Sequence, residues 1–135
     1  MSMLKYIIYI AFALSAIACN ADVVAPAEGC SSVITRYESE DPDVVEVKAI
    51  IDQTCSYSGC HDGAGGIGPG NYTRYQGMLR DLENGSFASR VIDVRENPSL
   101  GMPPDQSVYP QSLQDDLTEV QLEIITCWLQ EGFPQ

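Results

Sequence analysis

Two cysteines and the only histidine of this 135-residue chain lie within seven residues, in the segment Cys55-Ser56-Tyr57-Ser58-Gly59-Cys60-His61. The segment follows an amphipathic stretch and precedes a glycine-rich one. It constrains the fold strongly, because a small domain must build its core around whatever these groups bond to or bind. The chain has five cysteines in all, an odd number. In an oxidising compartment at least one sulfur is therefore left without a partner inside the chain.

The N-terminal segment predicts export. Lys5 is followed by an uncharged, almost wholly apolar run of 13 residues from Tyr6 to Ala18. At about 1.5 Å per residue this run is too short to cross a bilayer core of roughly 30 Å as a helix, so residues 1–18 are expected to be a signal peptide. The small residues before Cys19 resemble the lipobox of bacterial lipoproteins, in which that cysteine becomes the lipid-modified N-terminus. An ordinary secretory signal is the alternative.

Residues 19–40 predict a flexible tether, because small, polar and acidic side chains alternate there without a helical or strand-like period. The globular part is then expected over residues 41–135. Its helices are predicted from a start at Asp41-Pro42-Asp43 to Cys55, over Tyr72–Glu83, over Phe87–Val94, and from a capping box at Thr118 and Gln121 to Gly132. No strand pair is predicted, so the expected fold class is all-α.

The charge balance limits the partners that the protein can have. Nineteen acidic residues against seven Lys and Arg give a net charge of −12, which makes nucleic acid an improbable partner because its phosphates would be repelled. Hydrophobic residues form 44% of the chain, which favours a packed core over a disordered acidic tail. No nucleophile and base pair is evident, so we do not expect an enzyme.

Three interpretations compete for the cysteine and histidine segment. A structural zinc site would use Cys55, Cys60, His61 and the distant Cys127, but adjacent Cys60 and His61 point in different directions and exported thiols tend to oxidise. A Cys55–Cys60 disulfide leaves the place of the histidine unexplained. In covalent haem attachment, two thiols add to the haem vinyl groups and the histidine directly after the second thiol coordinates iron.

The order Cys, spacer, Cys, His resembles the attachment motif of short c-type cytochrome domains in exported bacterial lipoproteins, including planctomycete-type cytochrome c. The resemblance covers residues 43–133 and also includes Met102-Pro103-Pro104 and the helix end Cys127-Trp128-Leu129-Gln130-Glu131-Gly132. It implies a small cytochrome c-like helical domain with one haem c, thioether anchors at Cys55 and Cys60, a proximal His61 and a distal Met102. The spacer has four residues where the family usually has two.

This resemblance implies electron transfer without substrate chemistry. The acidic surface would favour a redox partner with a basic docking surface, and the membrane would be reached only through the lipid, on the periplasmic side of a bacterial membrane or as an outer-membrane lipoprotein. The alternative is a non-catalytic envelope lipoprotein, a binding or accessory module with a Cys55–Cys60 disulfide and no haem.

Two further features are left open. Once the resemblance has assigned the other cysteines, Cys30 and Cys127 remain, either as a disulfide or with Cys127 as a buried thiol beside the haem. Gly63, Gly65 and Gly68 match the dinucleotide-binding pattern, but no strand precedes them. We expect this glycine-rich loop either to turn tightly past a flat macrocycle or to be a mobile surface loop.

Overall fold

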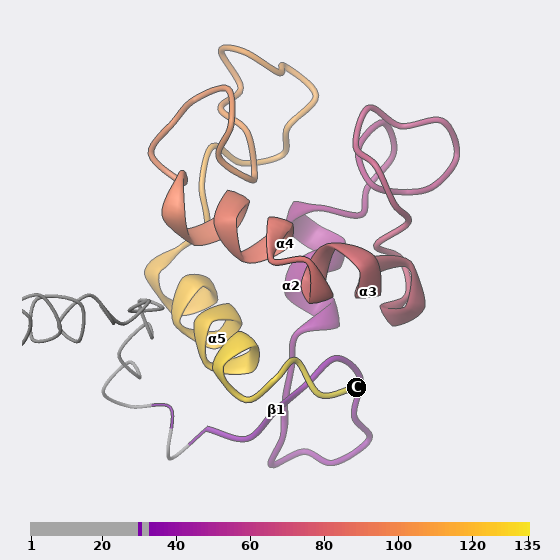
Figure 1. Cartoon of the computed structure of the whole chain (residues 1–135), viewed down its shortest axis with the longest axis vertical. Helices are drawn as coiled ribbons and strands as arrows, with labels where there is room; N and C mark the ends of the chain where they lie inside the picture. Colours follow the sequence, from indigo (N-terminus) through magenta and orange to yellow (C-terminus); the bar gives the residue numbers. More distant parts are fainter. Residues whose placement is uncertain (1–29, 31–32) are drawn as a thin grey trace, which may run out of the picture.

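Helices provide most of the regular structure in the computed structural model, which describes residue 30 and residues 33–135 (Figure 1). The elements in chain order are β1 (Thr35–Arg36), β2 (Val45–Glu46), α2 (Lys48–Thr54), α3 (Tyr75–Glu83), α4 (Ser86–Ala88), the π-helical turn η2 (Ser89–Asp93) and α5 (Glu119–Gln130). The expected signal peptide and the lipidation site Cys19 lie outside the described residues. Within the described part of the chain, no helix is both long and apolar enough to span a membrane.

Helix α5 begins at the capping box that the sequence predicts. The Thr118 hydroxyl accepts a hydrogen bond from the Gln121 backbone N–H, and the Gln121 side chain accepts one from the Thr118 N–H. This reciprocal pair satisfies two backbone donors that the first helical turn leaves without partners. Downstream, α5 buries Ile125, Cys127 and Trp128.

Trp128 is the centre of the core. Its side chain is fully buried, and the rings of Tyr37 and Phe87 lie 6.3 Å from its ring, with Phe133 at 6.4 Å. The indole N–H donates to the Pro134 carbonyl oxygen at 2.9 Å, so the polar end of the side chain is satisfied. One aromatic residue therefore joins the N-terminal segment, α4 and the C-terminal tail to α5.

A small parallel sheet, which the sequence did not predict, pairs Thr35 with Val45 and Arg36 with Glu46. Strands of two residues are too short to show an alternating pattern. The helix expected from Asp41 was wrongly placed at its start, since α2 begins only at Lys48. The Asp41 side chain instead accepts the Asp43 N–H at 3.0 Å and closes a local turn. The described residues are thus mainly helices and loops with one small sheet.

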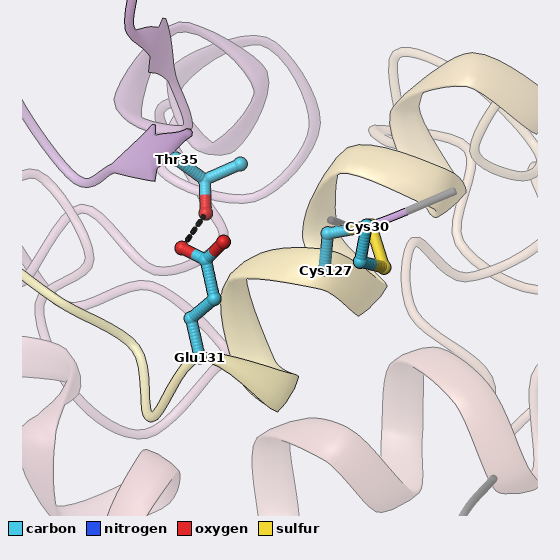
Figure 2. The surroundings of a disulfide bond; sticks show 4 residues. All are labelled: Cys30, Thr35, Cys127 and Glu131. Atoms are coloured by element: carbon cyan, nitrogen blue, oxygen red, sulfur yellow. Dashed lines mark hydrogen bonds between the residues drawn. A yellow bond between two sulfur atoms is a disulfide. The ribbon is translucent and has the colours of Figure 1, made fainter. Parts of the chain in front are cut away.

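The N-terminal segment is fastened to α5 by covalent and polar contacts (Figure 2). A disulfide joins Cys30 to Cys127, which is the first of the two alternatives considered for these cysteines. The Thr35 hydroxyl donates to the Glu131 carboxylate at 2.9 Å. Thr35 and Tyr37 are fully buried, so packed structure extends into residues for which a flexible tether was expected.

Candidate functional site

A cavity of about 600 Å³ brings the predicted site residues together. Cys55, Cys60, His61 and Met102 all line it, although Met102 follows His61 by 41 residues. Its volume lies in the range of about 300–1,000 Å³ that ligand sites occupy. Apolar side chains form much of the wall: Ile67, Pro69, Phe87, Val91, Leu100, Pro103 and Pro104.

The segment from Cys55 to His61 is a closed loop at the end of α2. The Cys60 N–H donates to the Tyr57 carbonyl oxygen and the His61 N–H donates to the Cys55 carbonyl oxygen, both at 3.1 Å. The four-residue spacer therefore folds back, and the hydrogen bond from His61 to Cys55 closes the loop. Cys55 is buried, Cys60 is half-buried, and both are free thiols. Burial raises the pKa of the Cys55 thiol to about 11, which keeps it protonated near neutral pH.

His61 is held in one tautomer. Its Nδ1 atom lies 2.7 Å from the Pro69 carbonyl oxygen. A carbonyl oxygen only accepts hydrogen bonds, so Nδ1 carries the proton and Nε2 of the neutral ring keeps a lone pair. Burial lowers the pKa of His61, which favours this neutral form. An imidazole arranged in this way is ready to coordinate a metal through Nε2.

Both faces of the His61 ring are covered. The Tyr72 ring is stacked on one face, with centroids 4.0 Å apart and planes inclined by 6°. A Cβ atom added to Gly68 would lie 2.4–2.6 Å from Cε1, Nδ1 and Nε2 of the same ring. Because these three distances are so similar, Gly68 approaches the ring from a face rather than from an edge. Tyr72 fills one face, so the bare backbone of Gly68 covers the other.

The glycine-rich loop thus packs against the cysteine and histidine segment itself. A Cβ atom on Gly66 would lie 1.9 Å from the Cys60 carbonyl oxygen, and one on Gly63 would lie 2.5 Å from the Asn71 side chain. Side chains at these positions would force the loop away. Neither expectation for this loop included this packing, because sequence alone does not show which backbone the glycines approach.

Tyr72 is supported on several sides. Its hydroxyl donates to the Asp81 carboxylate at 2.8 Å, its N–H donates to the His61 carbonyl oxygen at 2.7 Å, and its own carbonyl oxygen accepts the Tyr37 hydroxyl at 2.9 Å. Sequence reasoning missed Pro69, Tyr72 and Asp81 as site residues. It placed Tyr72 inside a helix, whereas α3 begins three residues later at Tyr75.

Met102 reaches the cavity from the long segment between η2 and α5. It is half-buried, packs against the hydrophobic core, and its N–H donates to the Arg90 carbonyl oxygen at 3.1 Å. Met78 is fully buried in α3 and does not line the cavity. Met102 is therefore the only methionine among the described residues that can offer a thioether there.

Cys127, the fourth ligand in the zinc interpretation, is bonded to Cys30 and so has no free thiolate for a metal ion. Over residues 30 and 33–135, no group of three or more His, Cys, Asp or Glu residues is placed to hold a metal ion. The Cys55–Cys60 disulfide of the second interpretation is not formed.

Comparisons of the chain with protein-family models, curated proteins and solved structures find no match. The site is therefore described by its own chemistry. Two free thiols, one imidazole with a fixed tautomer and one thioether converge on a single, largely apolar cavity.

Proposed function

We propose that this chain is an exported c-type cytochrome with a cytochrome c-like helical domain, which carries one covalently attached haem and transfers electrons. The observation that carries the proposal is the meeting of Cys55, Cys60, His61 and Met102 on one cavity. The two thiols and the histidine are close in sequence, but Met102 is not. Its position at the same cavity supports a ligand role over that of an ordinary core methionine.

Each chain residue has a defined role in this proposal. Cys55 and Cys60 would hold the haem through thioether bonds, because each S–H group can add across one vinyl group without any atom leaving. His61 offers Nε2 to the iron, while the Pro69 carbonyl oxygen holds the Nδ1 proton and fixes the ring plane. Met102 would offer its thioether as the second ligand of the iron. When bound, haem supplies one-electron exchange between ferrous and ferric iron, with a higher potential than two histidine ligands would give.

The apolar wall of the cavity would also favour the reduced state of the iron. Phe87 and Val91 are apolar, buried and line the cavity, so they limit water around the site. A less polar environment disfavours the additional charge of the ferric form, which raises the reduction potential. We do not propose substrate chemistry.

The location and partners follow from sequence features outside the cavity. Lipid at Cys19 would hold the protein on the periplasmic side of a bacterial membrane or at the outer membrane, and the net charge of −12 would steer a redox partner with a basic docking surface. Screening by salt should slow this encounter, since the Debye length falls to about 3 Å at 1 M salt.

Expression together with a haem-attachment system tests the proposal. After acid–acetone extraction, the wild-type protein should retain haem that gives a reduced pyridine spectrum. Cys55→Ala/Cys60→Ala should retain no haem because both thioether anchors are gone, whereas Met78→Leu, a change outside the cavity, should retain it. A colourless wild-type protein would defeat the proposal and favour a non-catalytic accessory lipoprotein without haem.

A further inference from the structure

Tyr57 lies in the four-residue spacer and makes polar contacts far along the chain. Its hydroxyl accepts a hydrogen bond from the Leu113 N–H at 3.2 Å and donates one to the Ser112 hydroxyl at 3.3 Å. Ser112 in turn donates its own proton to the Gln114 carbonyl oxygen at 2.7 Å. These three hydrogen bonds form a continuous chain from the Leu113 N–H to the Gln114 carbonyl oxygen, in which each hydroxyl accepts once and donates once.

We call residues 102–114 the distal loop, because this segment carries Met102. The distal loop contains no helix or strand, and much of its order comes from bonds around Ser112, which is buried. The Gln106 side chain donates to the Ser112 carbonyl oxygen at 2.9 Å. Ser112 is therefore hydrogen-bonded both to another residue of the distal loop, Gln106, and to Tyr57.

Tyr57 and the distal loop also border the same space. Tyr57 lines the cavity next to Cys55 and Cys60, while Met102 and Tyr109 line it from the distal loop. The hydroxyl of Tyr57 is the point where the cysteine and histidine segment bonds directly to the distal loop in the described part of the chain.

We propose that Tyr57 is a positioning residue that ties the distal loop to the cysteine and histidine segment and so holds Met102 at the cavity. This inference rests on the proposed function and gives the unusually long spacer a purpose. The tie acts through the loop, because Tyr57 is not itself a ligand. Loss of its hydroxyl should let the loop, and Met102 with it, leave the cavity more often.

The variant Tyr57→Phe tests whether the Tyr57 hydroxyl holds the distal loop in place. The measurement is the binding of carbon monoxide to the ferrous, haem-loaded protein. Carbon monoxide binds only while the distal position is open, so its binding rate reports how often Met102 is displaced. We expect an increase of about tenfold, equivalent to about 1.4 kcal/mol. Tyr75→Phe is the matched control, because it also removes a long-range hydrogen bond of a tyrosine hydroxyl, to the Phe133 carbonyl oxygen, but lies outside the cavity and the distal loop; it should bind carbon monoxide at the wild-type rate. An unchanged rate in Tyr57→Phe would overturn the proposal.

A second measurement does not depend on haem. The Leu113 amide donates to Tyr57, so its hydrogen exchange should be faster in Tyr57→Phe and unchanged in Tyr75→Phe. If no variant carries haem, the proposed function fails. The exchange rate of Leu113 and the methyl resonance of Met102 then test whether Tyr57 positions the distal loop. A change in both supports this role, and wild-type behaviour in either overturns it.

Discussion

Removal of the Cys30–Cys127 disulfide should cost the protein a large part of its stability. The bond joins residues that are 97 positions apart. In the chain-entropy account, closing a loop of this length lowers the entropy of the unfolded chain enough to contribute about 4.7 kcal/mol at 25 °C. Domains of this size have unfolding free energies of about 5–15 kcal/mol. The cross-link therefore contributes a large part of the free energy of unfolding.

Urea unfolding measures this loss directly. The comparison uses a Cys55→Ala/Cys60→Ala background, which excludes both haem attachment and thiol exchange with those residues. With a slope of about 1–2 kcal/mol per M, the added change Cys30→Ala/Cys127→Ala should lower the midpoint by about 2–5 M. Reduction of the background protein should give nearly the same shift, because it breaks the bond but keeps the side chains. A loss below about 1 kcal/mol in both would refute the reasoning.

Three other predictions address the site and the last helix. Gly68→Ala should lower the unfolding free energy by about 1–3 kcal/mol and shift the NMR signals of the His61 ring, because the new Cβ overlaps that ring. Gly65→Ala, which has a φ of +92° and open space, should destabilise the protein without moving those signals. Thr118→Ala should cost about 1 kcal/mol in urea unfolding through loss of the cap, and Thr118→Ser should restore it; equal stability of the two would contradict the capping role. Met102→Ala should keep covalent haem in a reduced pyridine spectrum but lose the near-infrared band of ferric thioether ligation, and a retained band would exclude Met102 as the ligand.

Local signals predicted the parts of the fold that depend on neighbours in sequence. The capping box at Thr118 needs only Gln121, three residues away, and α5 begins where it indicates. The start at Asp41 failed because the same aspartate can cap a helix or close a turn, and the pairing of Val45 with Thr35 places a strand where the helix was expected. The burial of Tyr37 was likewise decided by Trp128, which lies 91 residues further along.

The same distinction holds for the site. Cys55, Cys60 and His61 were found because their chemistry and spacing are visible in a short segment, and Met102 was found only through the resemblance. Tyr72 and Gly68 have no such pattern, since their role is to cover the His61 ring and this appears only when the loop has folded back. Residues that position a ligand are harder to predict than the ligand itself, because their partners are set by tertiary packing.

The bond between Cys30 and α5 also sets how far the domain can travel from a membrane. With lipid at Cys19, as proposed, only the 11 residues up to Cys30 are left to span the gap, because Cys30 itself is bonded to α5. Fully extended, they reach at most about 36–40 Å. Reduction of the disulfide would move the first fixed point to Thr35 and lengthen this reach to about 53–58 Å. In molecules that stay folded, a reducing agent would thereby change which partners lie within range.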